Sequence, residues 1–142
     1  SNIDTTTSNQ TMADSVDLDR AALKQSVQNY SKGMRQKLGL ISAFTSKKKL
    51  LLLDEPLSGL DPKARILIKR QLQSLKTSGA TTVMCTHMLN DLERLCDRIG
   101  ILHSGVFRFI GTPQACCEQY NANNLEEAYL NCISGAELIN EP

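Results

Sequence analysis

The chain has 142 residues, about the length of one ordinary domain, with 41% hydrophobic and 22% charged residues. Its formal net charge of +1 argues against a nucleic-acid partner, and no apolar run approaches the roughly 20 residues of a membrane-spanning helix. The five cysteines show no CxxC pair, so we expect reduced, mostly buried thiols rather than a disulfide framework or a zinc site.

The N-terminal third is predicted to be helical after a polar tail. Residues 1–16 lack any period, which is typical of a disordered tail or of one added by cloning. A modest helix is expected over residues 18–28. Ser31 then offers an N-cap for a second helix, which ends near the lysines at 47–49 and has an apolar face of Met34, Leu38 and Ile41.

The middle of the chain alternates strands and helices. Four leucines at 50–53 predict a strand that is buried on both faces of a parallel sheet. Asp61 followed by Pro62 predicts the start of a helix, which Gly79 ends. A second strand is expected over residues 81–86. The buried stripe of the intervening helix is Ile68, Leu72 and Leu75.

The last third adds a hairpin and further helices. An amphipathic helix is marked by Met88, Leu92 and Leu95. The pair Ser104-Gly105 predicts a turn between strands at 98–103 and 106–111, and helices follow after residue 113. The whole pattern favours an α/β protein with a largely parallel sheet and a terminal antiparallel hairpin.

Two carboxylates, Asp54 and Glu55, follow the first strand directly. Ligands of open α/β sheets bind beyond the carboxyl ends of the strands, so this pair suits Mg²⁺ binding and general-base chemistry on a phosphate. The alternative is a pair of acids satisfied by nearby basic side chains or backbone amides. His87 ends the next strand, and parallel strands would bring it to the same rim, where an imidazole could contact a phosphate.

Four motifs in this order resemble the C-terminal half of an ABC-type ATPase, the nucleotide-binding domain of ATP-binding-cassette transporters. YSKGMRQK (30–37) resembles the signature LSGGQQQR, and LLLLDEP (50–56) resembles the Walker B segment. SGLD (58–61) resembles the D-loop, and TH (86–87) resembles the switch histidine. The signature variant, with Lys32 and Met34, is similar to that of bacterial drug- and sodium-exporter ATPases. The stretch at 96–113 resembles the family's usual continuation.

The resemblance implies a fold and a domain organisation. The fold is a P-loop NTPase-like (RecA-like) parallel sheet flanked by helices, incomplete here, with the terminal antiparallel hairpin. After the tail at 1–16, residues 17–47 would end a helical subdomain that carries the signature. Residues 48–112 would form the C-terminal half of the ATPase core, and residues 113–142 the C-terminal helices.

The resemblance also implies site residues and ligands, namely ATP and Mg²⁺. Asp54 would hold Mg²⁺ through water, Glu55 would act as general base, and His87 would contact the γ-phosphate. The signature residues would contact an ATP bound by the opposite subunit, and Asp61 would lie at the dimer seam while capping its helix. The signature set is Ser31, Lys32, Gly33 and Met34.

One motif of the family is missing from this sequence, because no GxxxxGK[ST] phosphate loop occurs in the 142 residues. We therefore expect little ATP hydrolysis without a complementing Walker A segment. The implied partners are that segment, a second ATP-binding subunit and transmembrane permease subunits, with a cytoplasmic location at the inner face of the membrane. Two other functions stay open: a non-catalytic, truncated interaction fragment, and a soluble ABC ATPase without a transport role.

Overall fold

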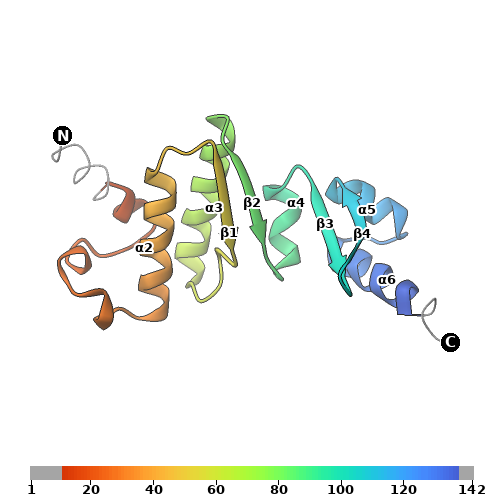
Figure 1. Cartoon of the computed structure of the whole chain (residues 1–142), viewed down its shortest axis with the longest axis horizontal. Helices are drawn as coiled ribbons and strands as arrows, with labels where there is room; N and C mark the ends of the chain where they lie inside the picture. Colours follow the sequence, from red (N-terminus) through yellow and green to blue (C-terminus); the bar gives the residue numbers. More distant parts are fainter. Residues whose placement is uncertain (1–10, 138–142) are drawn as a thin grey trace. The chain divides into compact units, whose positions relative to one another are not determined.

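The computed structural model describes residues 11–137 and divides the chain into two compact units, Ser1–Thr86 and His87–Pro142 (Figure 1). Each unit is described by itself. Among residues 11–137, every helix is too short or too polar to cross a bilayer. The fold is the α/β arrangement predicted from the sequence, with a parallel strand pair in the first unit and an antiparallel hairpin in the second.

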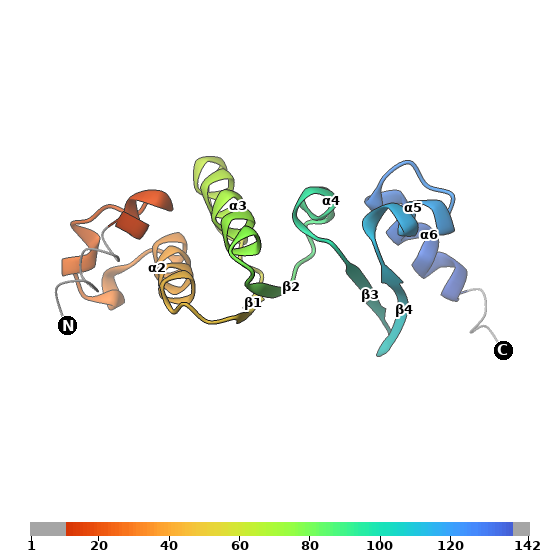
Figure 2. The same cartoon turned by 90° about the horizontal axis from the view of Figure 1, so that it is seen from above.

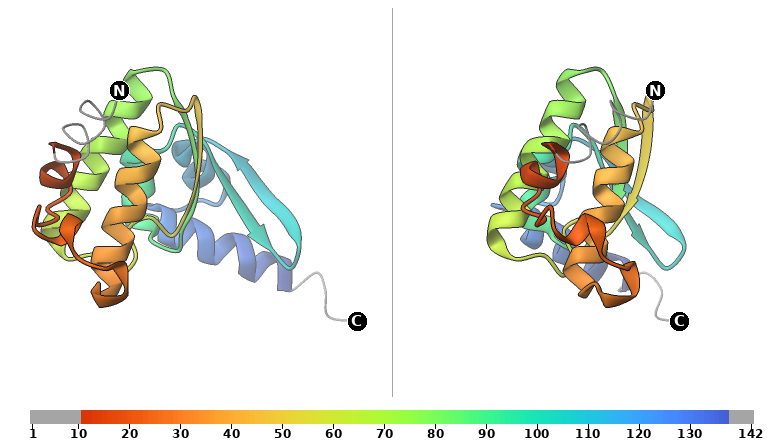
Figure 3. Two further views of the ribbon diagram at one scale, coloured as in Figure 1. Left: turned by 60° about the vertical axis from the view of Figure 1, so that its left-hand side comes forward. Right: turned by 90° about the vertical axis from the view of Figure 1, so that its left-hand side faces the viewer.

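The first unit is built on a βαβ crossover. Strands β1 and β2 pair in parallel, with Leu50 opposite Thr81 and Asp54 opposite Cys85. Helices α2 and α3 run side by side next to this strand pair (Figures 1 and 3). The elements are α2 (Lys32–Thr45), β1 (Leu50–Asp54), α3 (Pro62–Thr77) and β2 (Thr81–Cys85).

Both predicted helix starts of this unit are confirmed. The Ser31 hydroxyl accepts from the Met34 N–H at the start of α2, and the Asp61 carboxylate accepts from the Ala64 N–H at the start of α3. Gly79, with φ of 83°, follows the end of α3 as expected. The buried stripe of α2 is shifted from the predicted one and consists of Lys37, Leu40, Ile41 and Phe44.

One face of the β1–β2 pair is covered and the other is exposed. Leu51 is buried, and Ile68 of α3 is completely buried; Figure 2 shows α3 beside this strand pair. On the opposite face Leu50, Leu52 and Val83 are 55%, 73% and 52% exposed. The prediction that this strand is buried on both faces is therefore wrong for the described chain, because no described element of this unit packs on the second face.

The segment before α2 differs from its prediction. Instead of a helix over 18–28 it forms two short 3-10 helices, Ala22–Lys24 and Val27–Asn29. The Asp19 carboxylate accepts from the N–H of Ala21, a local bond that competes with helix formation. Residues 11–15 are helical, and Ala13 and Val16 are completely buried, although the sequence suggested no regular structure over 1–16. The expectation for residues 1–10 lies outside the described residues.

The second unit is a hairpin with helices packed on one face. Strands β3 and β4 pair in antiparallel fashion, and Ser104 and Gly105 have φ of 49° and 75°, which confirms the predicted turn. The predicted helix around residues 88–95 is only a 3-10 turn followed by one helical turn. The elements are η3 (Leu89–Asp91), α4 (Leu92–Leu95), β3 (Ile99–His103), β4 (Val106–Gly111), α5 (Pro113–Gln119) and α6 (Leu125–Glu137).

The core of the second unit lies between β3, β4 and the helices α5 and α6. It contains two of the five cysteines, and burial raises the pKa of the Cys116 thiol to about 11, so this thiol stays protonated at neutral pH. Cys85, in contrast, is exposed. The core residues are Ile101, Phe109, Cys116, Leu125, Ala128 and Cys132.

Candidate functional site

The two predicted carboxylates lie at the carboxyl end of β1. Asp54 is the last residue of the strand and is exposed, while Glu55 follows it and is half-buried. The Glu55 N–H donates to the carbonyl of Cys85 at 2.9 Å, which extends the hydrogen bonding between β1 and β2 by one bond. The Thr86 hydroxyl lies 3.4 Å from Oε2 of Glu55. The ends of the two parallel strands therefore meet at these acids, as the sequence predicted.

Glu55 has an unusual backbone conformation. Its φ is 45°, in the left-handed region that side chains other than glycine seldom adopt. Its carbonyl accepts two hydrogen bonds, one from the Ser58 N–H at 3.0 Å and one from Nε2 of Gln36 at 3.1 Å. The backbone of this residue is thus bonded on both sides, which keeps it in place despite the strain.

The loop after Glu55, residues 55–61, is anchored by apolar side chains and ends in a cap. Pro56, Leu57 and Leu60 are buried. Gly59, with φ of 70°, makes the turn between them. Asp61 then begins α3, so the loop connects the carboxylates directly to the next helix.

The N-terminal turn of α2, residues 31–34, lies against this loop. A Cβ built on Gly33 would come within 3.1 Å of the Gly59 carbonyl oxygen, so only a glycine allows this approach without a shift. The side-chain carbons of Lys32 lie over Gly59. The first N–H groups of a helix carry partial positive charge and suit an anion, and the 14 residues of α2 give it several full turns.

Asp61 also forms an ion pair across to α2. Its Oδ2 lies 3.3 Å from Nζ of Lys37, whose ammonium donates to the Asp17 carbonyl at 2.7 Å. The Ala64 N–H, and after it the Lys37 ammonium, lowers the pKa of the Asp61 carboxyl. The cap function of Asp61 is therefore observed, and its place at a dimer seam stays a prediction.

His87 belongs to the second unit, since the boundary between the units follows Thr86. Its side chain is exposed. The proximity of His87 to the carboxylates stays a prediction.

Sequence reasoning missed three residues of this region: Gln36, Lys37 and Thr86. Lys37 carried a signal, because it lies on the apolar side of α2 between Met34 and Ile41, where a cation needs a buried partner. Gln36 gave no such signal, since glutamine is a common residue on the solvent-exposed surface of helices. Thr86 is simply the residue before the histidine of the TH pair.

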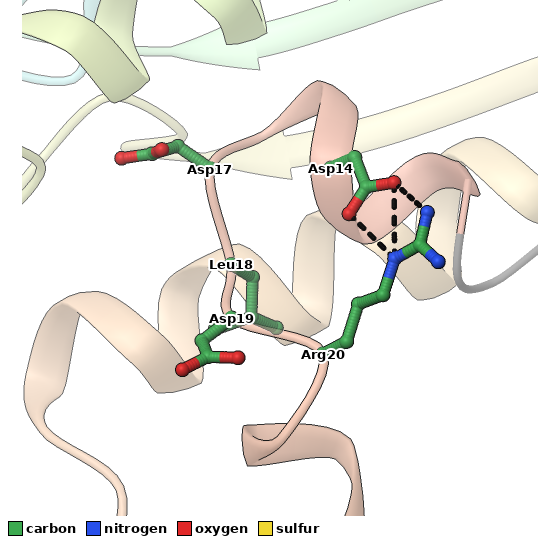
Figure 4. A pocket seen from close by; sticks show the side chains of 5 residues that line it. All are labelled: Asp14, Asp17, Leu18, Asp19 and Arg20. Carbon is green, nitrogen blue, oxygen red and sulfur yellow. Dashed lines mark hydrogen bonds and ion pairs between the residues drawn. The ribbon is translucent and has the colours of Figure 1, made fainter.

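Two hollows open on the first unit. One, of about 570 Å³, is lined by residues 14 and 17–20, and in it the Arg20 guanidinium is bonded to Asp14 while the Asp17 carboxylate points away (Figure 4). It contains none of the predicted site residues. The other, of about 250 Å³, lies between α2 and β1, and its lining includes Arg35, Gln36 and Asp54.

The donor set fits a hard cation that keeps most of its own water. No group of three or more His, Cys, Asp or Glu within the described residues could hold a metal by itself. Mg²⁺ in nucleotide sites takes one or two carboxylates and completes its shell with water and phosphate oxygens. The exposed carboxylate of Asp54 at the strand end meets that requirement.

Comparison with known proteins places these features in a family. A family model described as "AAA domain, putative AbiEii toxin, Type IV TA system" matches residues 2–90. The Nod factor export ATP-binding protein I of Bradyrhizobium diazoefficiens is 40% identical over 99 residues, covering 70% of this chain and 32% of that protein. The linearmycin resistance ATP-binding protein LnrL of Bacillus subtilis is 31% identical over 116 residues, covering 82% and 37%.

A solved structure agrees with these relatives. The structure of an ATP binding subunit of an ABC transporter matches with a TM-score of 0.71 and 34% identity, over 75% of this chain and 45% of that chain. The chain therefore spans about a third of the length of the two relatives and less than half of the solved subunit.

Proposed function

Because the chain belongs to the AAA domain family and its homologues are ABC transporter ATP-binding proteins, we propose that it supplies the C-terminal part of such a subunit. The first compact unit of this chain contains both the two acids that we assign to catalysis and the helix N-terminus that we assign to a phosphate. The complete subunit couples ATP binding and hydrolysis to transport through separate membrane subunits. Two named relatives act in export and in resistance, which favours the exporter-like branch.

One observation carries the proposal. Asp54 and Glu55 lie at the shared carboxyl end of two parallel strands, and the N-terminal turn of α2 packs on the loop that follows them. This is where open α/β sheets bind their ligands. A structural pair of acids, the alternative raised by the sequence, would not require a strained Glu55 bonded at both its N–H and its carbonyl.

The two acids have separate tasks in this proposal. Asp54, exposed at the strand end, would hold the Mg²⁺ that arrives with ATP, and that ion would supply charge neutralisation at the phosphates. Glu55 orients a water against the γ-phosphate and takes its proton. The hydroxyl of Thr86, 3.4 Å from Oε2 of Glu55, keeps that carboxylate at the strand ends. We assign a contact with the γ-phosphate to His87, as its resemblance to the switch histidine implies.

The α2 turn serves a second nucleotide. Its exposed end presents the Ser31 hydroxyl and the first N–H groups of a 14-residue helix, and the Lys32 ammonium adds positive charge. We assign to Ser31, Lys32, Gly33 and Met34 the contact with the γ-phosphate of an ATP bound by a second ATP-binding subunit. Asp61, at the other end of the packed loop, lies toward the seam of that dimer.

The remaining partners follow from the same assignment. Transmembrane permease subunits hold the complete ATPase at the inner face of the membrane. A Walker A segment, with the phosphate loop that the 142 residues do not contain, cradles the β- and γ-phosphates. Its strand and helix cover the exposed apolar face of β1 and β2, where Leu50, Leu52 and Val83 are each more than half exposed.

The test is ATP turnover by the complete subunit that carries these residues, assembled with its Walker A segment. Glu55→Gln should retain ATP binding and lower turnover by about 10²- to 10⁴-fold, the usual contribution of a general base. Glu126→Gln, the same change at an exposed position of α6, is the control and should leave turnover unchanged. Turnover that survives Glu55→Gln would remove Glu55 from the mechanism.

A further inference from the structure

Glu55 depends on a residue of α2 for its backbone conformation. Nε2 of Gln36 donates to the Glu55 carbonyl at 3.1 Å, across 19 positions of the sequence. A carbonyl oxygen only accepts, so the side-chain NH₂ of the glutamine must be the group that faces it. The contact is partly shielded from water, which raises the cost of losing it.

Gln36 and its neighbour Lys37 hold the two ends of the same loop. Gln36 bonds the first residue of the 55–61 loop, and Lys37 pairs with its last residue, Asp61, at 3.3 Å. Between these points the Gly33 backbone approaches Gly59 so closely that an added Cβ would lie 3.1 Å from the carbonyl oxygen. The first two turns of α2 are therefore attached to the loop at three points: at its start through Gln36, at its middle through Gly33 and at its end through Lys37.

The first of these attachments bears on catalysis. A residue at φ of 45° stores strain, and it persists only where its surroundings determine it. Rotation of the Glu55 backbone toward an ordinary conformation would swing its carbonyl away from Gln36 and redirect its side chain. A displacement of about 1 Å at a reacting group can cost up to two orders of magnitude in rate.

We propose that Gln36 is a positioning residue, which holds Glu55 in its left-handed conformation and ties the carboxylate to the phosphate-binding turn of α2. The inference rests on the proposed function, because it takes Glu55 as the general base. It adds a connection within one chain: the helix whose first turn is assigned to one phosphate is bonded, through Gln36, to the residue assigned as general base.

The experiment compares two single changes in the complete, assembled subunit. Gln36→Met keeps the length of the side chain and its helix propensity but removes the donor N–H. Gln73→Met, at an exposed position of α3, is the matched control. We expect Gln36→Met to lower kcat about tenfold, with the KM for ATP within about twofold of wild type and a Tm only a few degrees below that of the control.

A second readout separates positioning from general damage. In a Glu55→Gln background, single-turnover hydrolysis should be the same with Gln36 or Met at position 36, because the residue acts only through the carboxylate at position 55. An equal fall in both backgrounds would show a structural role and overturn the inference. If Gln36→Met does not fold, Gln36→Ala, which also removes the donor and keeps a high helix propensity, replaces it with the same expected result.

The outcomes also separate this inference from the proposed function. Normal turnover in Glu55→Gln would overturn the part of the proposed function that makes Glu55 the general base. A large fall in Glu55→Gln together with a kcat in Gln36→Met that equals the control would overturn only the role of Gln36.

Discussion

The packing of the α2 turn on the 55–61 loop can be tested with two glycines of one helix. Gly33 is the second residue of α2, and a Cβ there would lie 3.1 Å from the Gly59 carbonyl oxygen. Gly39 lies in the middle of the same helix, and a Cβ there would meet nothing within 4 Å. Gly33→Ala and Gly39→Ala therefore make the same chemical change in opposite surroundings.

The expected changes in the free energy of unfolding follow from helix propensity and from the contact of the added Cβ with its surroundings. Alanine in place of glycine in a helix interior is worth about 0.5–1 kcal/mol, so Gly39→Ala should stabilise the protein by that amount. At Gly33 the obstacle is backbone, in a loop fixed at both ends through Gln36 and Lys37. Overpacking of this kind costs about 1–3 kcal/mol, which outweighs the propensity gain. Gly33→Ala should then be destabilised by up to about 2 kcal/mol.

Urea unfolding followed by circular dichroism at 222 nm measures both free energies of unfolding under one set of conditions. The two variants should move the midpoint in opposite directions, with Gly39→Ala above and Gly33→Ala below wild type. Equal stabilisation of both variants would refute the reasoning, because it would mean that the α2 turn does not lie against the loop.

Three further predictions concern the dimer, the core and pH. In the complete subunit, Ser31→Arg should abolish ATP-dependent dimerisation by crowding the phosphate site, measured by size-exclusion chromatography; dimerisation that persists would contradict the signature assignment. Ile68→Ala, at a completely buried position, should lower the free energy of unfolding by about 2–5 kcal/mol in urea titrations, and a loss below about 1 kcal/mol would contradict the observed packing. The pKa of Asp61 is lowered in the folded state, first by the Ala64 N–H. Its contribution to stability is therefore present above the unfolded pKa of about 3.9 and lost as pH falls through the folded value. Asp61→Asn should thus be less stable than wild type at pH 7 and equal to it near pH 2, and a constant difference across that range would contradict the assignment.

Local chemistry explains why much of the first unit could be predicted. Ser31 and Asp61 are helix caps whose side chains bond the N–H three residues on, so the two helix starts are encoded within four residues each. The Ser104-Gly105 turn is encoded in the same way, by two residues with positive φ. The carboxylates at a strand end follow from the apolar run before them.

The failures have other causes. Over residues 18–28, side-chain bonds to the backbone replace a regular helix, between the Asp19 carboxylate and the Ala21 N–H and between the Tyr30 hydroxyl and the Ala22 carbonyl, and apolar periodicity does not show them. The bond from Gln36 to Glu55 spans 19 residues, so no local pattern encodes it. The exposure of Leu52 likewise depends on what packs against the sheet and not on the strand's own composition.

The central claim is that one chain offers its α2 turn to a partner's ATP and its carboxylates to its own. Mixing two inactive variants of the complete subunit, Ser31→Arg and Glu55→Gln, tests it most directly. In a mixed dimer of shared sites, one site collects both defects and the other is intact, so mixing should restore ATP turnover that neither variant shows alone. If both residues served the same chain's nucleotide, each site of the mixed dimer would keep one defect, and the absence of any recovered turnover would contradict the account.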